Sequence, residues 1–330
     1  MKNKIIYITI AILLIVVVYA CRDDKSVTGV VVSPNQLTLA VGEEALLTAT
    51  IQPDDAINKI VTWESNNTDV ATMNNNKVTA IAEGTATITV FTDEGNYKAT
   101  CELTVIHPAE PILKFVKGGT FTMGCSEEQA SQCLPDELPK HQVSVDGVNI
   151  GKYEVTQKQW KMVMGDNPSH FIGDNLPVEN VNQNDVLEFI SKLNELTGKQ
   201  YRLPTEAEWE FAARGGEKSH NFKYSGSNDI DIAAWYWGNS EFTTHPVGEK
   251  APNELGIYDM SGNVWEWCSD WYALYSNEIQ TNPTGPAAGT CKVARGGSWG
   301  NNLREWHVSA RLNENPETRN NCIGFRLVLP

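Results

Sequence analysis

Short runs of alternating apolar and polar side chains fill residues 27–106. Such alternation is typical of strands that bury one face, and the Pro, Gly, Asn and Asp residues between the runs favour turns. Because several short strands in one small segment are typical of a two-sheet sandwich, we expect an all-β domain here, with Trp63 in the core between the sheets. The expected strands are residues 29–33, 45–51, 59–63, 85–91 and 97–105.

Further along the chain, three segments have the apolar spacing and the end signals of helices. The first, residues 156–164, begins with a capping box of Thr156 and Gln159 and stops at Gly165. The second spans residues 184–197 and ends at a glycine. Its expected buried face consists of Val186, Leu187, Ile190, Leu193 and Leu196.

The third expected helix begins at a second capping box, which opens at Thr205, and it runs to Arg214. It carries three glutamates, Glu206, Glu208 and Glu210. We attribute two of them to stabilisation of the helix dipole in the first turn rather than to acid–base catalysis.

The segments outside these elements set the domain boundaries. Residues 107–111 contain two prolines and are expected to form a short, stiff linker. A second domain is expected over residues 112–330. From residue 220 onward it is rich in Gly, Asn, Trp and Pro and has only brief apolar runs. A domain with so few regular elements needs cross-links, which tryptophans, a metal ion or disulfides would supply.

Residues 1–20 have the pattern of an exporting signal peptide. Lys2 and Lys4 precede an apolar run over residues 5–20, which is shorter than the roughly 20 residues that a membrane-spanning helix needs. An uncleaved membrane anchor is the alternative interpretation.

The residues that follow this run predict lipidation. The sequence VYAC at residues 18–21 resembles a bacterial lipobox with Cys21 as the lipidated residue. Residues 21–26 would then be the lipidated N-terminus and its tether, which attaches the protein to a membrane. The tetrapeptide RDDK at residues 22–25 is similar to the acidic tag of some surface-exposed lipoproteins. We therefore expect an outer-membrane lipoprotein, with surface exposure as the consequence of that tag.

Composition narrows the choice of partners and compartments. The net charge of −15 argues against nucleic acid as a partner, because its phosphates would be repelled. If Cys21 carries a lipid, six of the seven cysteines remain, which suits an oxidising compartment. Cys101 lies in an expected strand and is interpreted as a buried thiol. Two disulfides are conceivable from the loops that the cysteines bracket, Cys125–Cys133 and Cys268–Cys291.

Residues 256–272, GIYDMSGNVWEWCSDWY, combine three tryptophans with three acidic side chains around a glycine turn. The turn can bring together oxygens from the Asp259 side chain, the Gly262 and Val264 carbonyls and the Glu266 side chain. Hard oxygen donors of this kind suit Ca²⁺. The alternative is an aromatic cluster with solvated carboxylates.

Six motifs follow one another along the chain: GGTFTMG (118–124), KYEVTQKQW (152–160), RLPTEAEWEFAARGG (202–216), GNVWEW (262–267), RGGSW (295–299) and GFR (324–326). In this order they resemble the formylglycine-generating enzyme family, whose members are also called sulfatase-modifying factors. The resemblance implies a mixed α+β domain akin to the C-type lectin fold over residues 112–330. The segment over residues 61–90 likewise resembles a group-2 bacterial Ig-like domain.

The resemblance also implies where copper and calcium would bind. Enzymes of this family bind copper through two cysteines, three and eight residues after the serine that corresponds to Ser298. Asn301 and Trp306 stand at those places, so we expect no copper and doubt the oxidase activity. The family's second calcium site maps onto Asp259, Gly262, Val264 and Glu266. Its other calcium site falls in residues 235–249, where Trp235 replaces an expected Asn ligand, so we expect one Ca²⁺.

Residues 300–322 form a polar segment that resembles the variable region of target proteins diversified by retroelements. Asn, aromatic and Arg side chains are common on recognition surfaces. A solvated Asn-rich loop is the alternative. If the segment binds a partner, Trp306→Ala is expected to weaken that binding and to leave the melting temperature nearly unchanged. The candidate ligand-binding residues are Ser298, Asn301, Asn302, Arg304, Trp306, His307 and Asn313.

These features predict a non-catalytic lipoprotein of the cell envelope. An Ig-like stalk would present a domain of the formylglycine-generating enzyme type, which would bind a protein or glycan ligand. One alternative is an oxidase or related modifying enzyme that uses a different redox centre. Another is a component of envelope assembly or scaffolding.

Overall fold

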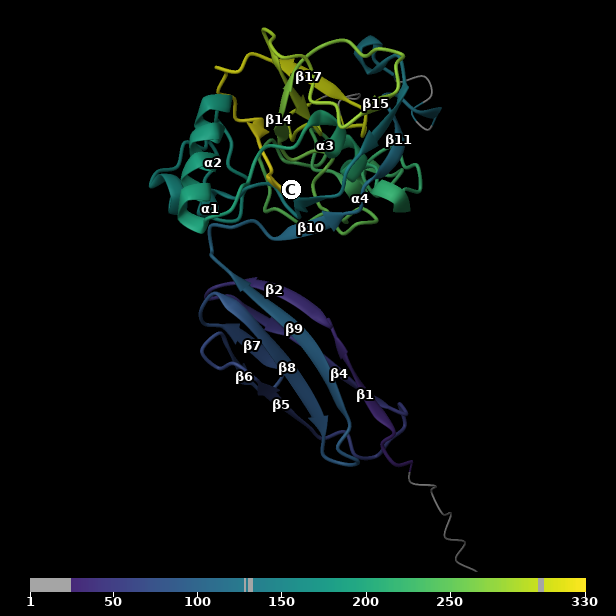
Figure 1. The fold of residues 1–330 in the computed structure, drawn as a ribbon, viewed down its shortest axis with the longest axis vertical. Coiled ribbons are helices and arrows are strands. Elements are labelled where there is room, and N and C mark those ends of the chain that lie inside the picture. The colour runs from purple at the N-terminus through teal and green to yellow at the C-terminus, as the bar shows by residue number, and fades with distance from the viewer. Residues whose placement is uncertain (1–24, 128, 130–132, 302–305) are drawn as a thin grey trace, which may run out of the picture. The chain divides into compact units, whose positions relative to one another are not determined.

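The computed structural model describes residues 25–330 except 128, 130–132 and 302–305. Cys21, Asn302 and Arg304 therefore lie outside the described residues. The chain divides into two compact units (Figure 1). Gly42–Thr104 and the segment up to Leu37 form the N-terminal unit, and Thr38–Val41 with Val105–Pro330 forms the C-terminal unit. In the part of the chain that is described, no helix is both long and apolar enough to span a membrane.

The N-terminal unit is built from strands alone, which confirms the expected all-β Ig-like domain. Its three sheets have the strand orders β1-β4, β2-β9-β8-β5 and β3-β7-β6. The expected strand over residues 45–51 is split at Leu47, whose N–H and C=O both pair with Asn76 instead of a neighbouring strand. Trp63 is only half-buried. The strands are β1 (Gly29–Ser33), β2 (Gln36–Ala40), β3 (Glu44–Leu46), β4 (Thr48–Gln52), β5 (Val61–Ser65), β6 (Ala71–Asn74), β7 (Lys77–Ala80), β8 (Gly84–Thr92) and β9 (Lys98–Ile106).

The C-terminal unit combines three small sheets with a few short helices, as the mixed α+β prediction requires. Its sheets have the orders β10-β13-β19, β11-β12-β15 and β17-β16-β14-β18. The strands are β10 (Leu113–Val116), β11 (Gly119–Met123), β12 (His141–Val145), β13 (Val148–Gly151), β14 (Trp265–Trp271), β15 (Gln280–Thr281), β16 (Lys292–Arg295), β17 (Arg311–Glu314), β18 (Ile323–Gly324) and β19 (Val328–Leu329). The helices are α1 (Gln157–Met164), α2 (Gln183–Thr197), α3 (Glu206–Ala213) and α4 (Ile230–Ala233), with 3₁₀ turns at Pro135–Glu137 and Gly216–Lys218.

All three sequence-predicted helices form. Each begins at a capping box: Thr156 caps α1, Asn182 caps α2 and Thr205 caps α3. Helices α1 and α2 pack together at one flank of the C-terminal unit (Figure 1). The sequence prediction thus identified the capping residues Thr156 and Thr205. It missed Asn182, because it started α2 one residue too late.

The buried face of α2 differs from the prediction at three positions. Leu187 and Leu196 are 52% and 51% exposed. Phe189, which the prediction omitted, is fully buried and stacks on Trp160 of α1 with ring centroids 5.2 Å apart. The buried face follows Val186, Phe189, Ile190 and Leu193, the three- and four-residue spacing of one helix side.

The segment expected to be a linker is partly a component of the C-terminal unit. Ala109, Glu110 and Pro111 are buried, and Ala109 belongs to the hydrophobic core that contains Trp160. Glu110 accepts hydrogen bonds from the Tyr201 hydroxyl and the Lys199 ammonium group. The two prolines suggested a short, stiff linker. The sequence did not reveal the contacts of Glu110, because Lys199 and Tyr201 lie about ninety residues away.

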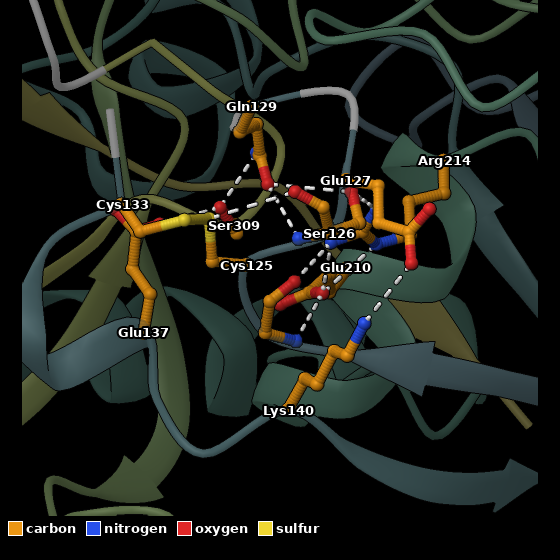
Figure 2. Close-up of a disulfide and its surroundings, with 11 residues drawn as sticks. Cys125, Ser126, Glu127, Gln129, Cys133, Glu137, Lys140, Glu210, Arg214 and Ser309 are labelled. Atoms are coloured by element: carbon orange, nitrogen blue, oxygen red, sulfur yellow. Dashed lines mark hydrogen bonds and ion pairs between the residues drawn. A yellow bond between two sulfur atoms is a disulfide. The ribbon is translucent and has the colours of Figure 1, made fainter. Parts of the chain in front are cut away.

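The cysteines confirm one of the two conceivable disulfides. Cys125 and Cys133 are bonded (Figure 2), whereas Cys268 and Cys291 are free thiols, so that pairing is wrong. Cys268 is held in the buried strand β14 and has no exposed surface. Cys101 is a buried thiol, as expected.

The disulfide closes over a buried polar cluster. In Figure 2, Gln129 points toward Ser309, to which its amide donates a hydrogen bond of 2.6 Å. The Ser309 hydroxyl in turn donates to Glu137 at 2.8 Å. Burial raises the pKa of Glu137, while Ser309 and Arg295 lower it. The disulfide thus closes the loop, and the hydrogen bond from Gln129 to Ser309 attaches this loop to the interior of the C-terminal unit.

Candidate functional site

Buried arginine–carboxylate pairs connect α3 to the sheet with the strand order β17-β16-β14-β18. Glu206 accepts two hydrogen bonds from Arg311, at 2.6 and 2.8 Å, and Glu210 is paired with Arg295. Burial raises the pKa of Glu206, but Arg311 and Arg295 outweigh it and hold that pKa below its usual value. Interaction with the helix dipole is therefore not the main role of these glutamates. They join α3 to β16 and β17.

A third such pair lies at the start of β14. Arg326 donates to both oxygens of Glu266, at 2.6 Å each, and its remaining donors bind the carbonyls of Gly151 and Tyr258 at 2.9 Å. The Trp209 indole N–H also donates to Glu266, at 2.7 Å. Glu266 is fully buried. Its two oxygens are thus already hydrogen-bonded within the protein.

Two more carboxyl groups surround this pair. Glu154 is 1% exposed and accepts hydrogen bonds from the Asn263 side chain at 2.8 Å and from the Val264 N–H at 3.2 Å. Asp259 is 3% exposed and accepts from the Gly248 N–H at 2.7 Å. The sequence prediction omitted Glu154, although it is a lone acidic residue inside the motif at residues 152–160.

The electrostatics of this cluster favour a cation. Burial, then the charges of Asp259 and Glu266, raise the pKa of Glu154 well above its usual value. Burial also raises the pKa of Asp259 to about 6. Three carboxyl groups thus face one guanidinium group, that of Arg326. A buried excess of negative charge is costly unless it is protonated or paired with a cation.

Gly262 forms the turn that joins these groups. Its φ of +84° is in the left-handed region, and a Cβ atom there would lie 2.3 Å from the carbonyl oxygen of Trp235. The adjacent Asn263 N–H donates to that same oxygen at 2.8 Å. Only glycine permits this approach of two backbone segments, so the turn expected from the sequence is present.

The donor set fits a calcium ion in charge and in atom type. Asp259 and the carbonyls of Gly262 and Val264 would hold it, and Glu154 would add charge. Glu266 would contribute charge alone, since Arg326 and Trp209 bind both of its oxygens. Among the described residues, no three of the carboxylates here have ligand atoms within 4.8 Å of one another, so carbonyl ligands are required. Calcium remains a prediction.

A chelator is expected to lower the melting temperature of the protein. Calcium at a hundredfold excess over its dissociation constant would stabilise the fold by about 3 kcal/mol through mass action. Asp259→Asn should remove this response, because it removes the charge of the one carboxylate that is proposed to contact the ion. Glu195→Gln, at an exposed position of α2, is the control and should retain it. Wild-type melting curves that are identical with and without chelator would exclude the ion.

The two positions that correspond to the family's copper-binding cysteines are filled by hydrogen-bonded side chains. The amide oxygen of Asn301 accepts from the Trp265 indole N–H at 2.8 Å and contacts the Ser298 hydroxyl. The indole N–H of Trp306 donates to the Ser298 carbonyl at 3.0 Å. Neither side chain offers a thiolate, which copper(I) prefers.

Three candidate ligand-binding residues lie in the interior instead of on a surface. Ser298, Trp306 and His307 are 0%, 3% and 1% exposed. Trp306 packs against Tyr236, with ring centroids 4.8 Å apart, and against Tyr224 and Ala233. The expectation that Trp306→Ala leaves the melting temperature unchanged is therefore wrong, because the sequence did not reveal the apolar residues that enclose this indole.

The remaining candidates lie in different surroundings. Burial, followed by the Lys223 charge, lowers the pKa of His307 to about 4, so its imidazole is neutral at neutral pH. Asn313 is exposed on β17, and Asn301 is half-buried. The sequence-predicted set thus divides into interior residues, Asn301 and Asn313 nearer the solvent, and Asn302 and Arg304, which lie outside the described residues.

The Cys322 thiol, which the sequence prediction placed away from the copper-binding positions, lies beside Ser298. The Cys322 sulfur would be 3.5 Å from a Cβ atom at Gly300. Burial raises the pKa of Cys322, while a hydrogen bond from Ser298 lowers it. Burial also raises the pKa of nearby Glu179 to about 7. Glu179 and Cys322 are far apart in the sequence, and only the fold brings these two side chains near each other.

Exposed aromatic side chains lie next to this position. Trp237 and Phe242 are 53% and 60% exposed, and their ring centroids are 6.1 Å apart. Their loop is attached to Trp299, because the Ser240 hydroxyl donates to the Trp299 carbonyl at 3.0 Å. Phe242 has a φ of +62°, which is uncommon for a bulky residue and is typical of strained functional positions. Phe171 and Trp299 form a second ring pair, with centroids 5.2 Å apart, which the Ser240–Trp299 hydrogen bond links to this loop. We call Phe171, Trp237, Phe242 and Trp299 the aromatic face.

The fold and the site define a class of protein. The C-terminal unit has little regular structure and is held together by buried Arg–carboxylate pairs. Residues 26–103 match the family described as the bacterial Ig-like domain of group 2. Residues 107–330 match the family described as the sulfatase-modifying factor enzyme 1-like domain. The chain therefore belongs to the sulfatase-modifying factor enzyme 1-like family, as the sequence motifs predicted.

Similar proteins include both enzymes and proteins with other names. The chain is 39% identical over 248 residues to the "Chaperone protein LppX" of Paenibacillus barcinonensis, which covers 60% of this chain and 81% of that protein. It is 34% identical over 200 residues to a formylglycine-generating enzyme of Thermomonospora curvata, and there it spans 51% of this chain and 60% of the enzyme. The solved structure of Treponema denticola variable protein 1 is 32% identical, with a TM-score of 0.60, and the match covers 71% of this chain and 96% of that one.

Proposed function

We propose that this protein is a non-catalytic binding protein of the cell envelope, in which the Ig-like unit presents a ligand-binding domain of the formylglycine-generating enzyme type. The observation that carries this proposal is the replacement of both copper-binding positions by Asn301 and Trp306. Each of these side chains makes a hydrogen bond within the protein, so the place of the family's redox centre is filled.

The aromatic face supports a binding role. Exposed Trp and Phe side chains stack on sugar rings or on apolar side chains, and such residues dominate recognition sites. The similarity to variable protein 1 and to a protein named as a chaperone supports binding, since neither name describes an oxidase. A lipid on Cys21 would place this domain at a membrane. The net charge of the whole chain, −15, leaves nucleic acid outside the expected partners.

A residual oxidase activity is the second candidate, and Cys322 is the observation that favours it. This thiol lies beside Ser298, where the family's chemistry takes place. A single thiol with a raised pKa, however, cannot form a disulfide there or hold copper(I) between two thiolates. The alternative therefore depends on a redox centre that the described residues do not supply.

The wild-type protein is expected neither to bind copper(I) at this position nor to convert a cysteine-containing sulfatase peptide to formylglycine. Copper(I) titration against a competing chelator and mass spectrometry of the peptide measure the two outcomes. A formylglycine-generating enzyme with both cysteines is the positive control. Turnover of the peptide by the wild-type protein would establish the enzyme alternative, and Cys322→Ser would then show whether the remaining thiol is responsible.

Binding itself is tested on the aromatic face. A glycan array and a panel of envelope proteins are probed with the wild type and with Trp237→Ala/Phe242→Ala, which removes two exposed rings without opening the core. Leu187→Ala, an exposed apolar residue of α2, is the matched control. Loss of a bound ligand in the first variant alone supports the proposal, and equal binding by both variants contradicts this choice of face.

A further inference from the structure

A cavity of about 430 Å³ lies between the start of α3, the end of β14 and the loop over residues 273–286. It shares no lining residue with the calcium cluster, with the Ser298 position or with the aromatic face. Its volume falls in the range of sites that bind small molecules. The residues that matter for its chemistry are Met123, His141, Glu206, Asp270, Leu274 and Arg311.

Asp270 is the polar group of this cavity that lacks a full set of partners. It is 4% exposed, and its Oδ2 atom accepts hydrogen bonds from the Glu206 N–H at 3.1 Å and from the Ser269 hydroxyl at 3.0 Å. Its Oδ1 atom accepts no hydrogen bond from any described residue. Oδ1 is not fully enclosed by the protein, so a ligand in the cavity can reach it and donate a hydrogen bond to it.

The cationic groups near the cavity are already engaged. Arg311 donates to both oxygens of Glu206 and to the Asp136 carbonyl, and its guanidinium lies 3.9 Å from the centre of the Tyr275 ring. The Lys292 ammonium donates to the Ser269 carbonyl. Neither Arg311 nor Lys292 makes a hydrogen bond or ion pair with the Asp270 carboxylate.

His141, which also lines the cavity, offers a second acceptor. His141 has its Nδ1 atom 3.2 Å from the Pro139 carbonyl oxygen. Because a carbonyl only accepts, Nδ1 carries the proton, and in the neutral ring Nε2 is an acceptor. A ligand that carries hydrogen-bond donors could therefore bond to both Asp270 Oδ1 and His141 Nε2.

We propose that this cavity binds the ammonium group of a small primary amine, with Asp270 Oδ1 as its principal acceptor. The alkyl part of the amine would contact the apolar side chains on the cavity wall. An ammonium group supplies three donors and a charge opposite to that of a carboxylate. The net charge of −15 would also draw cations toward the protein. The apolar wall consists of Met123, Ala207, Leu274, Pro283 and Pro286.

The titration of Asp270 makes the binding of the amine depend on pH. Burial and the Glu206 charge raise the pKa of Asp270 to about 7. An ammonium ion is attracted only to the ionised carboxylate, so each pH unit below 7 weakens binding about tenfold, and a shift from pH 8 to pH 5 weakens it about 100-fold. The charged or titratable groups that face Asp270 from neighbouring elements are Arg202, Glu206, Glu208, Lys292, His141, Tyr275 and Arg311.

The test uses n-butylammonium as the probe and n-butanol as its neutral match, with the full chain and titration calorimetry at pH 8. Asp270→Asn keeps the acceptor for the Glu206 N–H but removes the charge, and it should weaken amine binding at least tenfold. Glu195→Gln also removes one negative charge, from an exposed helix position, and should bind as the wild type does. Butanol should bind at least tenfold more weakly than the amine.

Two further measurements keep the proposal testable if Asp270→Asn fails to fold. Thr284→Trp fills the cavity from an exposed rim position and should abolish binding. Wild-type affinity should also fall about 100-fold between pH 8 and pH 5. Equal affinity for amine and alcohol, equal affinity at both pH values, or an undiminished affinity in the folded Asp270→Asn variant would each overturn the proposal.

Discussion

Replacing Arg326 with methionine is expected to lower the free energy of unfolding by about 3–5 kcal/mol. Arg326 is fully buried and pairs with Glu266 through two hydrogen bonds of 2.6 Å. Methionine would leave three buried carboxyl groups, those of Glu154, Asp259 and Glu266, without their guanidinium. Denaturant unfolding followed by circular dichroism measures the loss.

Arg319→Met is the matched control for this experiment. Arg319 also makes two hydrogen bonds to one carboxylate, that of Asp185, at 2.7 and 2.8 Å, but its side chain is 52% exposed. Exposed pairs contribute about 0–1 kcal/mol, so this variant should unfold nearly as the wild type does. Similar losses in the two variants would show that burial does not set the strength of the pair.

Trp306→Ala is expected to destabilise the protein by about 3–5 kcal/mol, because it removes a buried indole and leaves a cavity. The indole is 3% exposed, contacts Tyr236 and donates a hydrogen bond to the Ser298 carbonyl at 3.0 Å. The same residue stands where the family's enzymes hold a copper-binding thiol. Its role in this chain is to fill that space, and thermal and denaturant unfolding both report the loss.

Trp237→Ala, which truncates an exposed tryptophan of a neighbouring loop, is the control and should cost less than about 1 kcal/mol. A Trp306→Ala variant as stable as Trp237→Ala would mean that the surrounding residues close around the missing ring.

The local features of the fold could be predicted from the sequence. Capping boxes at Thr156 and Thr205 are formed by residues three apart, and the strands of the N-terminal unit follow a period of two. The Gly262 turn also depends on a few neighbouring residues, together with the one backbone segment that it approaches. Each of these features is encoded within a short stretch, so its pattern is visible without a structure.

The features that depend on distant residues could not be predicted in this way. Glu206 meets Arg311 across 105 positions, and Glu266 meets Arg326 across 60. The charges were visible in the sequence, but their partners were not, so two glutamates of α3 were attributed to the helix dipole. The same limit explains why Trp306 was expected on the surface and why Asp270 was not singled out as a candidate site.

The tryptophans are distributed very unevenly between the two units. Nine of the ten belong to the C-terminal unit, and Trp63, half-buried on β5, is the single one in the N-terminal unit. Intrinsic fluorescence therefore follows the C-terminal unit almost alone. A Trp63→Phe variant would make the Ig-like unit silent in the tryptophan emission spectrum, so that fluorescence would follow the C-terminal unit alone while circular dichroism follows both units in the same sample.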